Sequence, residues 1–246
     1  MLTRLLRLSS DVAAYRRAEK FLKWTDAKYG VDSQRNHELV DTCGRNPPEM
    51  VQINFANREV NCKIVYYGPG KSGKTTNIEV VHAQAPDGRK GKLVSIATEK
   101  DRTLYFDFLP IDLGTIAGMT TKFQLYTVPG QVFYDATRKL VLQGADAVVF
   151  VADSNPELKL ENIESVQNLV ANMKSNGLDV MDTPIVFQWN KRDLPEVMPI
   201  EEMNADLNPW NAPAIEAVAV NGAGVMQTLK QVATLVIKRL SKDFGR

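Results

Sequence analysis

The stretch that decides the fold is Gly68-Pro69-Gly70-Lys71-Ser72-Gly73-Lys74-Thr75. It follows the apolar run 64–67 and precedes residues 76–85, which contain neither proline nor glycine. Such a sequence is typical of a strand, a phosphate loop and a helix. The glycines let the backbone curl so that successive N–H groups point inward, and the positive end of the helix adds to the field. The sequence therefore predicts a site for the phosphates of a nucleotide.

Individual side chains of this phosphate loop (residues 68–75) have predicted roles. Lys74 is expected to reach the β- and γ-phosphates as a point charge, and the Thr75 hydroxyl is expected to bind Mg²⁺. The predicted nucleotide contacts in this region are Gly68, Gly70, Lys71, Ser72, Gly73, Lys74, Thr75 and Thr76. An incidental glycine turn ahead of a helix is the alternative, but every fixed position of the loop pattern is matched.

The composition excludes several classes of protein. A formal net charge of +1 over 246 residues argues against a general nucleic-acid binder, which needs a strong basic excess. Cys43 and Cys62 lack metal-ligand spacing, so a reducing, cytoplasmic setting fits, and Cys62 is expected to act as a small apolar residue of a strand. The longest apolar run, 147–152, is far shorter than the roughly 20 residues of a membrane span, so no transmembrane segment is expected.

Residues 1–49 read as an N-terminal extension ahead of the main domain, 50–246. The first 30 residues mix apolar and basic side chains, which is compatible with an amphipathic helix on a membrane surface or a partner. Three other interpretations stay open: a helix packed on the main domain, a disordered arm, or a leader ahead of a true start at Met50.

From Met50 onward, short apolar runs alternate with helical stretches, a pattern that predicts an α/β fold with a mostly parallel, doubly wound sheet flanked by helices. Strands are expected at 51–55, 62–67, 104–109, 123–128, 147–152, 184–189 and 214–220, and helices at 76–85, 157–176 and 225–240. The run 147–152 is entirely apolar and the run 184–189 is apolar except for Gln188, as is typical of central parallel strands.

The segment after the sixth expected strand, Asn190-Lys191-Arg192-Asp193, indicates guanine recognition. A carboxylate at Asp193 accepts from the adjacent N1–H and N2–H₂ donors of guanine, whereas adenine presents an acceptor there. Asn190 is expected to tie this loop to the phosphate loop, and the Lys191 stem is expected to lie over the purine. After the last expected strand, the segment containing Ala219 and Val220 is placed to offer a backbone N–H to the guanine O6.

Two further loops supply candidates for the chemistry. Gly130 is expected to donate its N–H to the γ-phosphate, and Gln131 to orient the attacking water. In the loop 97–103, Thr103 is a candidate to complete the Mg²⁺ shell, and Arg102 to neutralise charge on the transferring phosphoryl group. Taken alone, a threonine or arginine in a loop is usually solvated surface.

These motifs, in this order and spacing, resemble those of a Ras-like small GTPase. More narrowly, Asp101-Arg102-Thr103-Leu104 leading into Phe106-Asp107-Phe108-Leu109-Pro110, together with Thr127-Val128-Pro129-Gly130-Gln131, resembles the MglA-like bacterial gliding and polarity GTPases. The resemblance covers about residues 50–240. It implies a cytoplasmic, Mg²⁺-dependent GTP/GDP switch that controls cell polarity and is recruited to the poles through partners. The implied partners are motility effectors and a roadblock-type MglB homodimer acting as GTPase-activating protein.

The sequence departs from the general Ras pattern at Thr127, where most relatives carry an aspartate that holds a Mg²⁺-bound water. A neutral hydroxyl there predicts looser metal binding. The resemblance to the narrower group, which shares the threonine, implies a working enzyme whose own arginine, matching Arg102, replaces one donated by the activator. Two alternatives remain: a P-loop ATPase or kinase, and a GTP-bound scaffold without turnover.

Overall fold

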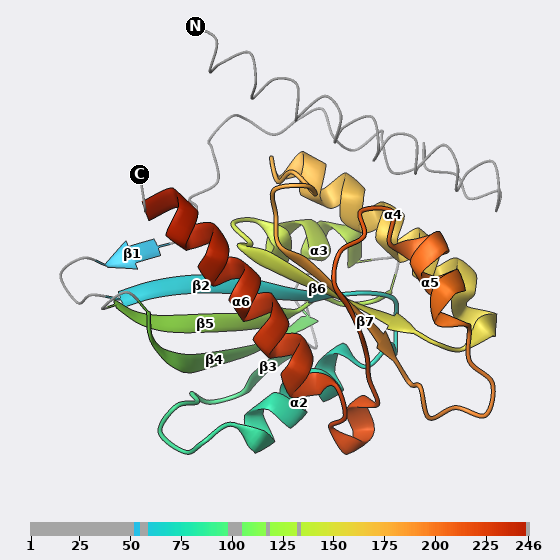
Figure 1. Cartoon of the computed structure of the whole chain (residues 1–246), viewed down its shortest axis with the longest axis horizontal. Helices are drawn as coiled ribbons and strands as arrows, with labels where there is room; N and C mark the ends of the chain where they lie inside the picture. Colours follow the sequence, from blue (N-terminus) through green and yellow to red (C-terminus); the bar gives the residue numbers. More distant parts are fainter. Residues whose placement is uncertain (1–51, 55–58, 98–104, 117–118, 132–133, 245–246) are drawn as a thin grey trace, which may run out of the picture.

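The computed structural model describes residues 52–54, 59–97, 105–116, 119–131 and 134–244 (Figure 1). Arg102, Thr103, Cys43 and the N-terminal extension lie outside these residues. The described strands are β1 (Gln52–Asn54), β2 (Glu59–Tyr67), β3 (Val94–Ala97), β4 (Tyr105–Ile116), β5 (Met119–Thr127), β6 (Ala147–Asp153), β7 (Ile185–Asn190) and β8 (Ala214–Glu216). The described helices are α2 (Lys74–Gln84), α3 (Asp135–Leu142), α4 (Lys159–Ser175), α5 (Ile200–Leu207) and α6 (Val225–Phe244).

These strands form one sheet in the order β3-β4-β5-β2-β6-β7-β8, with β1 paired to the start of β2. The strands from β5 to β8 are parallel, whereas β3 and β4 add an antiparallel edge. The predicted α/β class is therefore confirmed. Because the carboxyl ends of the parallel strands meet at one edge of the sheet, the loops after β2, β5 and β7 converge there.

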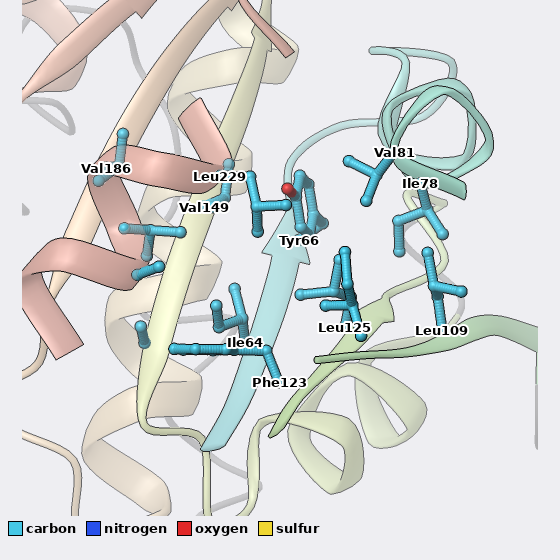
Figure 2. Close-up of a cluster of buried hydrophobic side chains, with 14 of the residues drawn as sticks. Ile64, Tyr66, Ile78, Val81, Leu109, Phe123, Leu125, Val149, Val186 and Leu229 are labelled. Carbon is cyan, nitrogen blue, oxygen red and sulfur yellow. The ribbon is translucent and has the colours of Figure 1, made fainter. Parts of the chain in front are cut away.

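Each face of the sheet carries its own core. One cluster packs α2 and α6 on the sheet through side chains such as Ile64, Ile78 and Leu229 (Figure 2). The opposite cluster packs α3, α4 and α5 on the sheet through side chains such as Phe150 and Leu169. Since strand side chains alternate between faces, neighbouring residues of β2 enter different cores. β6 and β7 are buried along their whole length, as their apolar runs predict.

Both long helices follow the sequence pattern. The residues of α6 that follow the helical period face the core: Val225, Leu229, Val232 and Val236 are buried, and Leu240 is partly buried against them. α4 begins after a 3₁₀ turn, Pro156–Leu158, and Gly177 follows it with a φ of 70°, a left-handed conformation that glycine adopts without strain. None of the helices in the described ranges is both long and apolar enough to cross a membrane.

Several boundaries differ from the sequence predictions. The edge strand β3 was not predicted, and the short helices α3 and α5 were missed. The last strand was predicted to reach residue 220 but ends at Glu216, because residues 219–221 turn into a 3₁₀ helix. That turn brings the segment back to Asn190, to which Ala219 donates a hydrogen bond.

Candidate functional site

The phosphate loop lies between the end of β2 and the first turn of α2, and its backbone requires glycine at two positions. Gly68 has a φ of +139°, and a Cβ there would lie 2.1 Å from the carbonyl oxygen of Val151. Gly73 has a φ of +102°, and a Cβ there would lie 2.2 Å from Asn190 Nδ2. The loop therefore packs directly on β6 and on the last residue of β7, which leaves its other side open toward a ligand.

Lys74 is a buried cation held by the loop itself. Its Nζ donates to the carbonyl oxygens of Gly68 at 2.9 Å and Pro69 at 2.5 Å. Burial, together with the nearby Arg138 guanidinium, lowers the pKa of Lys74 to about 7, while the Asp107 carboxylate acts to raise it. Because the nearby Asp107 carboxylate offsets the charge of this buried ammonium only in part, a phosphate bound beside it would stabilise the charged form.

The phosphate loop opens onto a cavity of about 430 Å³. Its walls are formed by residues 70–76 apart from Ser72, by residues 127–131, and by the single residues Asp107 and Tyr134. The cavity thus brings together Lys74, Thr75, Gly130 and Gln131, which the sequence assigned to phosphate, metal and water.

Asp107 is a cavity residue that the sequence analysis missed. It lies on β4 and is only 8% exposed. Its Oδ2 accepts hydrogen bonds from Thr75 Oγ1 at 2.7 Å and from Thr127 Oγ1 at 2.9 Å. Strand alternation carried a signal for it, because Asp107 falls on the same inward face of β4 as Leu109 and Ile111. A carboxylate on the inward face of a strand indicates a polar partner or ligand there, whereas a charge on the exposed face does not.

The guanine loop, residues 190–193, is tied to the rest of the site through Asn190. Its Nδ2 donates to Ser72 O at 2.7 Å, so the predicted link to the phosphate loop is present. Its Oδ1 accepts from Ala219 N at 2.9 Å, so this N–H supports the loop in the structure and is not directed to a purine. Val220, the neighbouring candidate, is 77% exposed.

The two charged residues of this loop differ in their surroundings. Lys191 has a left-handed φ of 65°, and its Nζ lies 2.5 Å from Oδ2 of the buried Asp153, which fixes its stem across the loop. Asp193 is exposed, and no side chain or N–H in the described part of the chain donates to its carboxylate. This carboxylate is therefore open to a ligand's donors.

Buried amide side chains anchor the first turn of α2 to β7 and α6. Asn77 Nδ2 donates to Gly73 O at 2.9 Å and to Gln188 Oε1 at 2.8 Å. Gln188 Nε2 in turn donates to Thr228 Oγ1 of α6 at 2.9 Å. Since none of these side chains borders the cavity, the chain of bonds orients the phosphate loop without occupying it.

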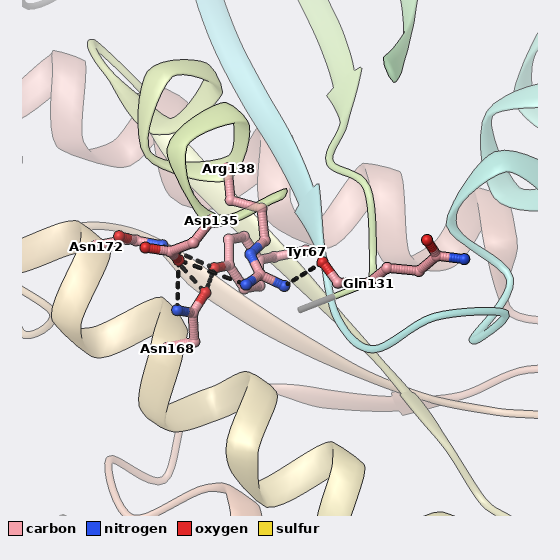
Figure 3. A network of polar contacts seen from close by, with 6 residues as sticks. All are labelled: Tyr67, Gln131, Asp135, Arg138, Asn168 and Asn172. Atoms are coloured by element: carbon pink, nitrogen blue, oxygen red, sulfur yellow. Dashed lines mark hydrogen bonds and ion pairs between the residues drawn. The ribbon is translucent and has the colours of Figure 1, made fainter. Parts of the chain in front are cut away.

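A second polar network supports the segment after β5 (Figure 3). Arg138 of α3, only 4% exposed, donates through Nη1 to Gln131 O at 3.3 Å and pairs through Nη2 with Asp135 at 3.4 Å. Asp135 Oδ1 also accepts from Asn168 at 2.6 Å and Asn172 at 2.9 Å, both on α4. The sequence analysis missed Arg138: its contacts with Gln131 and Asp135 are local, but the Asp135 carboxylate with which it pairs is held by α4, 33 and 37 residues along the chain.

Comparisons with known proteins identify the family of the chain. The model of the Ras family matches residues 94–238. The chain is 56% identical over 190 residues to the mutual gliding-motility protein MglA of Myxococcus xanthus (strain DK1622), an alignment covering 77% of this chain and 97% of the relative. It is 22% identical over 193 residues to ADP-ribosylation factor-like protein 6 of Caenorhabditis elegans, covering 76% and 91%, and 23% identical over 198 residues to its counterpart in Caenorhabditis briggsae, covering 76% and 92%. The chain therefore belongs to the Ras family, as a small GTPase homologous to MglA.

Proposed function

We propose that this protein is a Mg²⁺-dependent switch that binds GTP, hydrolyses it to GDP and thereby controls gliding motility and cell polarity. One observation carries the proposal: Lys74, Thr75 and Gln131 border a single cavity whose phosphate loop is tied through Asn190 to a guanine-type loop. The motility assignment rests on the 56% identity to a gliding-motility protein.

In the proposed reaction a water attacks the γ-phosphate of GTP in line with the bond to the leaving GDP. Lys74 neutralises the β- and γ-phosphates, and the Gly130 N–H holds the γ-phosphate. Gln131 orients the water, and the Arg138 contact to its carbonyl fixes the backbone from which it projects. Because Lys74 and the backbone of Gln131 are held by hydrogen bonds within the protein, less reorganisation of these two groups is needed at the reaction step.

The residues also fit the metal that such a reaction uses. Mg²⁺ prefers oxygen ligands, and Thr75 presents its hydroxyl at the cavity beside the Asp107 carboxylate. When bound, Mg²⁺ would supply charge that offsets the β- and γ-phosphates. Thr103 remains the proposed second protein ligand, and Arg102 the proposed cation for the transition state; both lie outside the described residues.

The proposed partners follow from the family resemblance. A roadblock-type MglB homodimer would act as GTPase-activating protein by positioning Arg102, and motility effectors would bind the GTP form. The working compartment is then the cytoplasm, with recruitment to the poles through partners, and nucleic acid takes no part.

Single-turnover phosphate release separates the competing functions. The wild-type chain should release phosphate from GTP faster than from ATP, and a roadblock partner should accelerate the GTP reaction. Arg102→Ala should keep GTP affinity but lose most of the acceleration, since an arginine of this kind contributes roughly 10³–10⁵ in rate. Preference for ATP would favour an ATPase or kinase, and tight GTP binding without turnover would favour a scaffold.

A further inference from the structure

The end of β5 carries Thr127 where most Ras-like relatives carry an aspartate, yet a carboxylate still reaches this point from the neighbouring strand β4. β4 pairs antiparallel with β5, and Asp107 lies one residue beyond the pair Phe108–Tyr126, which sets it opposite Thr127. The Asp107 N–H donates to Thr127 Oγ1 at 2.8 Å. β4 therefore supplies a carboxylate at the cavity, opposite the point where β5 carries a hydroxyl.

The carboxylate of Asp107 is fixed by three hydroxyl groups. Oδ2 accepts from Thr75 at 2.7 Å and from Thr127 at 2.9 Å, and Oδ1 accepts from Ser95 on β3 at 2.7 Å. At 8% exposure, the carboxylate has little freedom to leave this arrangement. Two of these hydroxyl-bearing residues, Thr75 and Thr127, border the cavity.

The direction of the Thr75 bond matters for metal binding. A hydroxyl has one proton and two acceptor lone pairs, and a metal ion is bound by the oxygen lone pair. Because the Thr75 proton is donated to Asp107, the lone pairs are the part of the hydroxyl left for a ligand on the cavity side. Carboxylates that hold metal ligands in this way typically affect metal affinity about 10- to 100-fold.

We infer that Asp107 is the positioning residue of the magnesium site: from β4 it takes over the place of the aspartate that Thr127 lacks, by orienting Thr75 and adding negative charge beside the cation. Thr127 then serves to hold this carboxylate. The inference rests on the proposed function, because it concerns the metal that accompanies the nucleotide. It predicts that the threonine on β5 does not weaken magnesium binding as its neutral side chain alone would suggest.

The test is the release rate of a fluorescent GDP analogue from the full chain at a series of free Mg²⁺ concentrations. Asp107→Asn keeps the size of the side chain but removes its charge and one of its two acceptor oxygens. For this variant, the Mg²⁺ concentration that gives half-maximal retention of the GDP analogue should rise by at least about tenfold. In EDTA, release from the variant should match the wild type within a few-fold, because no metal is then present to be positioned.

Two further variants separate positioning from a general structural role. Ser95→Ala removes a hydrogen bond from the same carboxylate but leaves Thr75 untouched, so its Mg²⁺ dependence should stay within about threefold of wild type. The double variant Asp107→Asn/Thr127→Asp returns a carboxylate to β5, at the residue whose Oγ1 now lies 2.9 Å from Asp107 Oδ2, and should bring the Mg²⁺ midpoint most of the way back to the wild-type value.

The outcomes that overturn the inference are distinct from those that overturn the proposed function. If Asp107→Asn accelerates release equally with Mg²⁺ and with EDTA, or leaves the Mg²⁺ midpoint unchanged, Asp107 has no positioning role. The inference is also contradicted if the double variant is as stable to urea as the wild type but needs as much Mg²⁺ as Asp107→Asn to retain the GDP analogue. A wild-type chain that retains no guanine nucleotide at any Mg²⁺ concentration refutes the proposed function instead.

Discussion

Gly130→Ala should damage the site through the contact between the segment after β5 and the phosphate loop. A Cβ at Gly130 would lie 2.3 Å from Gly70 N and 2.5 Å from Pro69 C, and both atoms are backbone. Ordinary van der Waals contact begins at 3.4 Å, so the two loops must separate by about 1.1 Å. Overpacking of this kind costs roughly 1–3 kcal/mol of folding stability, and a displacement of about 1 Å at a catalytic group costs roughly 10² in rate.

Gly70, which lies on the other side of this contact, is the position of a matched control variant. A Cβ at Gly70 would have Gly130 C at 3.9 Å as its nearest neighbour and needs no left-handed backbone, so Gly70→Ala should change stability by less than about 0.5 kcal/mol. Urea denaturation of both variants measures the difference, and single-turnover phosphate release measures the rate of Gly130→Ala against wild type. Equal stability of the two variants, with wild-type hydrolysis by Gly130→Ala, would refute the steric argument.

Three further predictions concern single side chains. Asp193→Asn should shift nucleotide preference from guanine toward xanthine, whose C2 oxygen accepts a hydrogen bond; an unchanged preference for GTP in a competition assay contradicts this. Lys74→Ala should nearly abolish nucleotide retention through gel filtration, because it removes the buried cation of the phosphate loop. Burial, assisted by the Asp146 carboxylate, raises the pKa of Cys62 to about 12, and an acid with a raised pKa keeps its proton to higher pH. In a Cys43→Ala background, a thiol reagent at about pH 8 should therefore modify Cys62 only after unfolding, as mass spectrometry would show.

The sequence predicted the structure correctly where the spacing of residues along the chain by itself reflects their burial in the fold. The phosphate loop has a fixed spacing, and the apolar runs of β6 and β7 reflect burial on both faces of the sheet. The stripe on α6 likewise follows the helical period. These features need no knowledge of distant partners, so their positions were predicted to within a few residues.

The missed elements depend on partners far along the chain. β3 is four residues long, and Val94 and Ser95 on it are exposed, so no apolar pattern marks it; its pairing with β4 defines it. The last strand stops early because Asn190 attracts the Ala219 N–H into a turn. Asp107 was passed over because its role arises from hydrogen bonds to residues 32 and 20 positions away.

The bonds of Asn190 have a consequence for the speed of nucleotide exchange. They join the guanine loop to Ser72 and Ala219 within the protein, so the purine half of the site is already assembled when a nucleotide arrives. Little conformational entropy is then lost on association, and nucleotides with different bases should arrive at similar rates but depart at very different ones. A protein that accelerates exchange would gain most by loosening the phosphate half, where release depends on Lys74 and the metal.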